Sequence, residues 1–199
     1  MIYVIDDDPS VREALQNLLE SIGLASQTFT STHEFSRADR AEEPSCLILD
    51  VRLPGVSGLE FQANLKKQGV SLPIIFITAH GDVPMTSRAM KAGAIEFLMK
   101  PFQKEELLAA VRHGLDRDGA YRSEQAEIAV LRSRFEQLTG REREVMELVA
   151  KGRTNKEIGS SLGLSEVTVK IHRSHMMQKM QVGSLAELVR ISDKLHKSH

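Results

Sequence analysis

The sequence predicts a doubly wound α/β domain built on a five-stranded parallel sheet, followed by a small all-α domain that contains a helix-turn-helix. Two patterns carry this prediction. In residues 1–117, short β-branched apolar runs alternate with longer stretches of helical period, which is typical of a parallel sheet wrapped by helices. In residues 138–199, helical patterns follow one another without a strand between them. The 199 residues suffice for two domains of this size.

The first domain is expected to contain five strand–helix units. The apolar runs place strands at residues 2–5, 25–29, 46–49, 74–78 and 95–99. Pro9 suits the first turn of a helix that reaches about residue 21. Further helices fit residues 32–40, 58–67, 83–92 and 104–117.

Residues 118–137 are interpreted as a helical linker. Ile128, Leu131, Phe135 and Leu138 follow one another at helical spacing, so the segment has one apolar stripe. Two interpretations of this stripe remain open. It packs against one of the chain's own domains, or it extends the preceding helix into a contact between two copies of the chain.

The helices of residues 138–199 are expected to begin at capping residues. Two capping boxes and two single serines mark these starts: Thr139 with Glu142, Thr154 with Glu157, Ser165 and Ser184. The third helix runs to about residue 180. A short turn at Gly163 and Leu164 separates the second helix from the third, which predicts a helix-turn-helix.

Charge is distributed unevenly along the chain. The net charge is −1 overall, but it is −4 over residues 1–117, −1 over residues 118–137 and +4 over residues 138–199. A mildly basic domain is compatible with a polyanionic partner but does not by itself indicate one. The apolar stretches are strand-sized and the N-terminus has no leader pattern, so we expect a cytoplasmic protein without a membrane partner.

Polar side chains follow four of the five predicted strands. They are Asp6, Asp7 and Asp8 after the first strand, Asp50 after the third, Thr78 at the end of the fourth and Lys100 after the fifth. Ligands of a doubly wound sheet bind outside the carboxyl ends of its strands. If the first and third strands are neighbours, Asp7 and Asp50 converge, and a cation relieves their repulsion. Oxygen ligands and an open site favour Mg²⁺, with Mn²⁺ as a substitute.

This arrangement suits phosphoryl transfer. Asp50 can attack a phosphoryl donor to give an acyl phosphate, while the cation neutralises charge on the transferring group. Lys100 and Thr78 can contact the other phosphoryl oxygens. Asp8, beside Pro9, is interpreted as a helix cap without a chemical role.

Several motifs in residues 1–117 resemble the receiver domains of two-component systems. They are VIDDD at 4–8, LDVRLPG at 49–55, SG at 57–58, ITAH at 77–80 and KPF at 100–102. The resemblance implies the flavodoxin-like strand order 2-1-3-4-5. It also implies that a sensor histidine kinase phosphorylates Asp50, and that a cis peptide bond precedes Pro101.

The same resemblance assigns roles around Asp50. Asp7, Asp50 and the backbone carbonyl of Arg52 would bind Mg²⁺, and Asp6 would act through water. Lys100 and Thr78 would contact the phosphoryl group. Thr78 would also move together with the aromatic residue of the fifth strand, here Phe97, to relay phosphorylation. A tyrosine is often found at this position of the fifth strand, and Phe97 lacks its hydroxyl. Burial, without a hydrogen bond, would therefore have to hold the Phe97 side chain inward.

The third helix of the tail has one packing face and one exposed face. Val169, His172, Met176 and Met180 fall on one side, and Ile171 and Ser174 on the other. An exposed Ile171 suits a thymine methyl in the major groove, and Lys170 suits a guanine edge or a phosphate. Phosphate contacts are expected from the polar residues Thr168, Asn155, Lys156 and Lys179.

Residues 138–195 resemble the LuxR-type helix-turn-helix. The motifs are LTGRE at 138–142, TNKEI at 154–158, LG at 162–163 and VTVKIH at 167–172. With the receiver motifs they point to the FixJ/NarL family of transcription regulators. That resemblance places Lys170, Ile171 and Ser174 at base-contacting positions and implies that residues 184–195 help the protein to dimerise on DNA.

The resulting expectation is a transcription factor, not a metabolic enzyme, although its receiver assists its own phosphorylation and dephosphorylation. Phosphorylation would promote a homodimer that binds double-stranded promoter DNA, with RNA polymerase as a further partner. The sequence also admits two alternatives. The DDD sequence at 6–8 also fits a phosphatase with Asp6 as nucleophile, but that interpretation leaves Asp50 and the tail unused. The tail could instead bind a protein.

Overall fold

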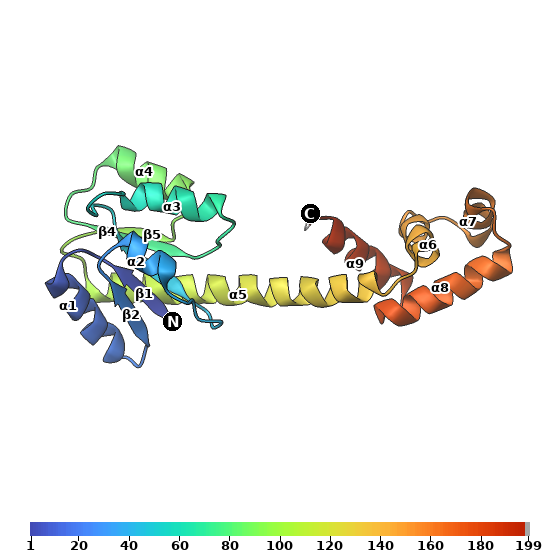
Figure 1. Ribbon diagram of the computed structural model, residues 1–199, viewed down its shortest axis with the longest axis horizontal. Helices are drawn as coiled ribbons and strands as arrows, with labels where there is room; N and C mark the ends of the chain where they lie inside the picture. Colours follow the sequence, from blue (N-terminus) through green and yellow to red (C-terminus); the bar gives the residue numbers. More distant parts are fainter. Residues whose placement is uncertain (198–199) are drawn as a thin grey trace. The chain divides into compact units, whose positions relative to one another are not determined.

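The computed structural model describes residues 1–197, which divide into two compact units, Met1–Arg122 and Ser123 onward (Figure 1). The last two residues of the predicted tail domain, 198 and 199, lie outside the described residues. Each unit has a hydrophobic core of its own. No helix in the described range is long and apolar enough to cross a membrane.

The first unit contains a five-stranded parallel sheet in the order β2-β1-β3-β4-β5, which confirms the predicted order. Its strands are β1 (Ile2–Ile5), β2 (Ser26–Phe29), β3 (Cys46–Asp50), β4 (Ile74–Thr78) and β5 (Glu96–Met99). Strand β1 pairs with β3 through Ile2 opposite Cys46 and Ile5 opposite Leu49. The carboxyl ends of β1 and β3 therefore lie side by side.

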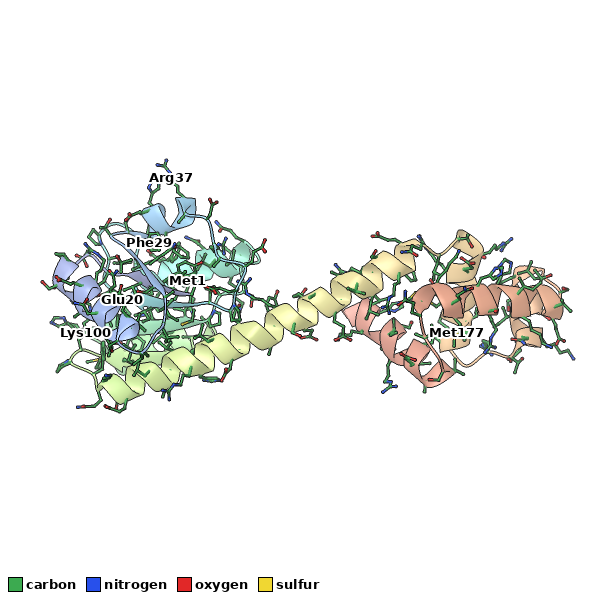
Figure 2. All side chains as sticks on the ribbon, turned by 90° about the horizontal axis from the view of Figure 1, so that it is seen from below. Met1, Glu20, Phe29, Arg37, Lys100 and Met177 are labelled. Carbon is green, nitrogen blue, oxygen red and sulfur yellow. The ribbon has the colours of Figure 1, made fainter. Side chains whose placement is uncertain are left out.

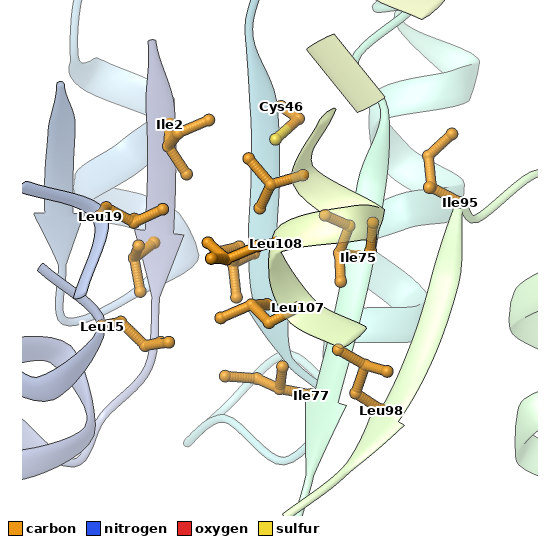
Figure 3. Packing of buried hydrophobic residues seen from close by; sticks show 14 residues of the cluster. Ile2, Leu15, Leu19, Cys46, Ile75, Ile77, Ile95, Leu98, Leu107 and Leu108 are labelled. Atoms are coloured by element: carbon orange, nitrogen blue, oxygen red, sulfur yellow. The ribbon is translucent and has the colours of Figure 1, made fainter. Parts of the chain in front are cut away.

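Helices cover both faces of this sheet. Helix α1 (Pro9–Glu20) and the first part of α5 (Lys104–Glu136) pack on one face, where Leu15, Leu19, Leu107 and Leu108 meet the buried strand residues (Figure 3). The other face is covered by α2 (Thr32–Arg37), α3 (Gly58–Lys67) and α4 (Val83–Lys91). Side chains of the three central strands β1, β3 and β4 alternate between the two cores, so these strands are buried on both faces.

Helix α2 is shorter than predicted. The sequence placed its end at residue 40, whereas the helix ends at Arg37 because Ala38 adopts an extended conformation, with φ −77° and ψ 144°. The segment that follows is held elsewhere, since the backbone N–H of Ala41 donates a hydrogen bond to the hydroxyl of buried Tyr3 at 2.7 Å. The other predicted limits in this unit, except for α5, lie within one residue of those observed.

Helix α5 is continuous from Lys104 to Glu136, so the predicted helix end at residue 117 was wrong: the helix continues through the segment interpreted as a helical linker. Its contacts with the first unit continue past that point. The carboxylate of Asp118 is buried and accepts hydrogen bonds from the backbone N–H of Ser45 at 2.8 Å and from the Arg122 guanidinium. A Cβ at Gly119 would lie 3.6 Å from Pro44 Cγ, and helical geometry is maintained around this glycine.

The second unit consists of the end of α5 and four further helices. They are α6 (Gly140–Ala150), α7 (Asn155–Leu162), α8 (Glu166–Met180) and α9 (Leu185–Lys197). Both predicted capping boxes are present, and Ser165 caps α8. Gly163 has φ 68°, a left-handed conformation that glycine adopts without strain and that ends α7 in a tight turn.

The predicted apolar stripe of α5 is buried within this second unit. Ile128 and Leu131 are buried, and Leu138 belongs to the core formed by α6 to α9. An ion pair of 2.6 Å between Glu127 and Lys194 joins α5 to α9. The single chain therefore uses the stripe for packing against its own helical domain.

Candidate functional site

Three aspartates converge at the carboxyl edge of the sheet. Asp6 and Asp7 follow β1, and Asp50 ends the neighbouring β3. Each contributes a carboxylate oxygen to a group in which all such atoms lie within 4.8 Å of one another, in a search confined to the described residues. Asp6 and Asp50 are buried, whereas Asp7 is exposed. The convergence expected from the strand order is therefore present.

Lys100 reaches this group from the end of β5. Its Nζ lies 2.6 Å from Asp6 Oδ2 and 2.7 Å from Asp50 Oδ2, so one ammonium bridges two carboxylates. The peptide bond between Lys100 and Pro101 is cis, as predicted. The sequence indicated that Lys100 belongs to this edge, but it did not reveal that Asp6 shares its ammonium with Asp50.

The charges at this edge influence one another. Burial raises the pKa of Asp6, and the hydrogen bond from Lys100 offsets only part of that effect. Burial alone would lower the pKa of Lys100, but its hydrogen bonds to Asp50 and Asp6 outweigh burial and raise it above the ordinary value. Lys100 is therefore a cation at neutral pH. Three carboxylates around one ammonium can accommodate a second positive charge when they are ionised.

The donor set fits a hard divalent cation. Oxygen is the only donor element that the three aspartates supply, which suits Mg²⁺ or Mn²⁺. Asp50 Oδ1 accepts a hydrogen bond of 2.8 Å from the backbone N–H of Arg52, which folds the chain after β3 back over the carboxylate. Asp6 Oδ1 accepts one of 3.0 Å from the N–H of Asp8. The carboxylate of Asp7 has no such bond within residues 1–197.

Thr78 ends β4 at the same edge of the sheet as the acidic group, and Phe97 lies on the neighbouring strand β5. Thr78 is buried, and its hydroxyl lies 3.3 Å from both the carbonyl oxygen and the N–H of His80. Phe97 is buried against Phe76, with 6.1 Å between ring centroids. A Cβ on Gly81 would lie 2.9 Å from the Phe97 ring, so the loop after β4 packs directly on the predicted relay residue.

Helix α8 exposes the residues predicted to face DNA. Val169, Met176 and Met180 are buried in the core of the second unit, while Ile171 is 50% exposed and Lys170 and Ser174 are exposed. The apolar side chain of Val167 is 66% exposed at the start of the same helix. Helix α8 therefore presents polar and apolar groups together on its outer face, as a reader of base edges requires.

Three of the predicted phosphate-contacting residues already have partners in the chain. Asn155 Oδ1 accepts a hydrogen bond of 2.8 Å from Arg173, a residue for which the sequence predicted no role. Thr168 lies 2.8 Å from Ser165 through their hydroxyls. Lys179 Nζ lies 2.7 Å from Glu142 Oε2. Lys156 is exposed. These pairs connect α8 to α6, to α7 and to its own N-terminus.

The pair between Glu142 and Lys179 fixes the helix that carries the exposed face. Glu142 is buried on α6 and completes the capping box with Thr139: its carboxylate accepts a hydrogen bond of 2.8 Å from the Thr139 N–H, and its own N–H donates one of 3.3 Å to the Thr139 hydroxyl. Burial alone would raise the pKa of Glu142, but the hydrogen bonds from Lys179 and Thr139 outweigh it, so its pKa is lowered. The charged carboxylate is therefore the form that stabilises this domain.

Glu142→Gln is expected to destabilise the second unit by about 1–3 kcal/mol at neutral pH, because a buried charge-assisted hydrogen bond is lost. A carboxyl with a lowered folded pKa stabilises at pH values above its ordinary 4.5 and loses that effect as the pH falls through the folded value. The difference between wild type and variant should therefore shrink in acid. The free energy of unfolding of both proteins is measured by urea titration at neutral pH and below about pH 4, with the NMR signals of α8 as the probe of unfolding.

Glu144→Gln is the matched control on the same helix. Glu144 pairs with Arg141 at 2.7 Å, but both side chains are about half exposed, so the change should cost less than about 1 kcal/mol. Equal losses in the two variants, or a Glu142→Gln loss that persists unchanged in acid, would show that the buried carboxylate does not stabilise the domain.

Each of the two units matches a known protein family. The model for the response regulator receiver domain matches residues 2–112, and the model for bacterial regulatory proteins of the luxR family matches residues 136–192. The chain is a two-component response regulator of the FixJ/NarL family. This response regulator therefore has a receiver domain and a LuxR-type DNA-binding domain, which leaves the phosphatase interpretation without support.

Relatives of the response regulator share its full architecture. It is 50% identical over 195 residues to Nodulation protein W of Bradyrhizobium diazoefficiens, covering 98% of this chain and 86% of that protein. It is 42% identical over 191 residues to the transcriptional regulatory protein FixJ of Azorhizobium caulinodans, covering 96% and 90%. The solved structure of the response regulator StyR aligns with a TM-score of 0.85 and 49% identity over 97% of this chain and 98% of that one.

Proposed function

We propose that a partner sensor histidine kinase phosphorylates this response regulator on Asp50 in a Mg²⁺-dependent reaction, and that phosphorylation promotes dimerisation and binding to promoter DNA. The observation that carries this proposal is the convergence of Asp6, Asp7 and Asp50 around the Lys100 ammonium. The receiver and LuxR-type domains imply the kinase and the promoter as partners. RNA polymerase is the further partner through which a promoter-bound regulator acts.

Each residue at the acidic edge has a distinct part in this reaction. Asp50 forms a bond from a carboxylate oxygen to phosphorus while the bond from phosphorus to the donor's histidine nitrogen breaks, and the nitrogen retains the electron pair. Lys100 and the Thr78 hydroxyl contact the phosphoryl oxygens. Asp7, Asp50 and the Arg52 carbonyl would hold Mg²⁺, and Asp6 would do so through water. The cation, when bound, neutralises charge on the transferring group.

Thr78 and Phe97 form the proposed relay. In the unphosphorylated chain the Thr78 hydroxyl is engaged by the backbone of His80. Contact with a phosphoryl oxygen would draw this hydroxyl away and release the loop that packs on Phe97. The surface near β5 would change as a result, and this change favours a dimer.

At the DNA, a dimer presents two copies of α8 to adjacent half-sites. Lys170, Ile171 and Ser174 would read base edges, while Asn155, Lys156, Thr168 and Lys179 would contact phosphates. Helix α9, expected to take part in dimerisation, leaves Leu185 exposed at its start. The domain boundaries of this proposal are a receiver to about residue 117, a helical connection over 118–137 and the DNA-binding domain after it.

Removal of the metal tests the proposal. With Mg²⁺ and acetyl phosphate the wild-type chain is expected to gain one phosphoryl group, seen by intact mass, and to sediment as a dimer. Chelation of divalent cations should abolish both effects, and Mn²⁺ should restore them. Full labelling in the presence of the chelator would contradict the metal's role, and labelling without any change in sedimentation would contradict the dimer.

A further inference from the structure

Arg12 reaches back from α1 to the chain segment that carries the acidic group. Its Nη1 donates hydrogen bonds to two backbone carbonyl oxygens, that of Asp6 at 2.7 Å and that of Asp7 at 3.0 Å. Neither family resemblance nor spacing singled out this arginine. The guanidinium is partly buried beside a segment whose side chains form the proposed metal site.

The start of α1 explains why Arg12 can make these contacts. Asp8 caps the helix by accepting a hydrogen bond of 2.8 Å from the N–H of Ser10, and Pro9 occupies the first turn. The N–H of Arg12 then bonds to the carbonyl oxygen of Asp8 at 3.1 Å, as the first helical turn closes. Helical side chains lean toward the N-terminus, so the Arg12 guanidinium is directed over the preceding loop.

These two hydrogen bonds fix the orientation of the peptide groups that follow Asp6 and Asp7. Asp6 has further restraints, because its carboxylate bonds to Lys100 and to the N–H of Asp8. The exposed carboxylate of Asp7 makes no hydrogen bond or ion pair with the part of the chain that the structure describes. The backbone that Arg12 holds is therefore the main restraint on where Asp7 lies.

We propose that Arg12 is a positioning residue for the metal site, which holds the Asp6–Asp7 backbone so that Asp7 stays beside Asp50 and Asp6. This inference deepens the proposed Mg²⁺-dependent phosphorylation and rests on it. A purely electrostatic role of Arg12 would have the opposite effect on Mg²⁺ affinity, because the positive charge of a guanidinium near three carboxylates repels a divalent cation. Removal of Arg12 thus weakens metal binding if positioning dominates and strengthens it if charge dominates.

The test compares Arg12→Ala, Arg12→Lys and the control Arg37→Ala in the full chain. Arg37 projects from α2 away from the sheet, so its loss removes the same charge without touching the β1–α1 loop (Figure 2). Mg²⁺ binding is measured directly by calorimetry, and acetyl phosphate labelling is measured across a range of Mg²⁺ concentrations. Far-UV circular dichroism confirms that each variant is folded.

Arg12→Ala is expected to raise the Mg²⁺ dissociation constant about fivefold or more, the effect of losing two hydrogen bonds at the weak end of their usual net strength. Its labelling rate should return to within about twofold of wild type once Mg²⁺ saturates, because Asp50 and Lys100 are intact. The Mg²⁺ dissociation constant of Arg12→Lys should lie between those of wild type and Arg12→Ala. Its ammonium keeps the positive charge but bonds to the two carbonyl oxygens less well than a guanidinium does. Arg37→Ala should bind Mg²⁺ as wild type does.

An unchanged or lower dissociation constant in Arg12→Ala overturns the inference, as does an equal rise in Arg37→Ala. If Arg12→Ala fails to fold, Arg12→Lys decides alone, and wild-type Mg²⁺ binding in that variant overturns the inference. Failure of the proposed function is distinguishable, because wild type would then bind Mg²⁺ in the calorimeter without being labelled.

Discussion

Asp50→Asn is expected to abolish labelling by acetyl phosphate. A neutral amide is a poor nucleophile and cannot form an acyl phosphate, and it no longer contributes a charged oxygen to a cation. The fold should tolerate the change, because the amide oxygen of asparagine can still accept the hydrogen bond that Asp50 Oδ1 takes from the N–H of Arg52. Lys100 keeps its second partner, Asp6. The complete loss of labelling is therefore expected to come from loss of the nucleophile and not from loss of the fold.

Asp8→Asn provides the matched control. It makes the same chemical change in the neighbouring loop, at a residue that caps α1 and lies outside the group of three converging carboxylates. Asparagine caps helices as well as aspartate does, so this variant should be labelled like wild type. Intact mass after incubation with Mg²⁺ and acetyl phosphate measures the labelling of Asp50→Asn and of Asp8→Asn. Wild-type labelling of Asp50→Asn would show that the phosphoryl group goes elsewhere.

Lys170→Ala and Ile171→Ala are each expected to weaken specific DNA binding by about tenfold or more, equivalent to about 1–3 kcal/mol per base contact. Both residues lie on the exposed face of α8, and neither belongs to the core beneath it. Phosphorylation of Asp50 should be unchanged. The probe is a duplex selected from a random pool by the wild-type protein, and fluorescence anisotropy at fixed salt gives the affinities.

The salt dependence of binding shows what Lys170 contacts. Its loss lowers the slope of log affinity against log salt by about one where the ammonium contacts a phosphate and leaves the slope nearly unchanged where it reads a base edge, whereas loss of Ile171 leaves the slope unchanged. Val130→Ala is the control for Ile171, because Val130 is equally exposed, at 50%, but lies on α5. Wild-type affinity in both α8 variants would contradict this face as the DNA reader. Loss of labelling as well would indicate damage to the fold.

The sequence predicted features that depend on local pattern or on one topological rule. Short apolar, β-branched runs located the strands, the helical period located most helices, and capping boxes located the starts of α6 and α7. The rule that parallel strands share a carboxyl edge predicts that Asp7 lies near Asp50, as the structure shows. The packing face of α8 followed from its helical spacing.

Pairings between distant positions could not be predicted in this way. Asp118 bonds to the N–H of Ser45, 73 residues away, and this contact helps to fix α5 against the first unit beyond the predicted helix end. Lys179 appeared as a phosphate contact because an isolated lysine on a DNA-binding helix is ordinarily solvated, yet its ammonium is paired with buried Glu142. No local pattern reveals such a partner, since the pairing arises only when separate helices pack together.

The most direct test of the central claim is the affinity of the full chain for its selected DNA duplex, measured with and without acetyl phosphate in the presence of Mg²⁺. Wild type is expected to bind at least about tenfold more tightly after phosphorylation, since a dimer engages two half-sites at once. Asp50→Asn should bind with the same low affinity in both conditions. Equal tightening in Asp50→Asn, or full labelling of wild type with no gain in affinity, would contradict control of the DNA-binding domain through Asp50.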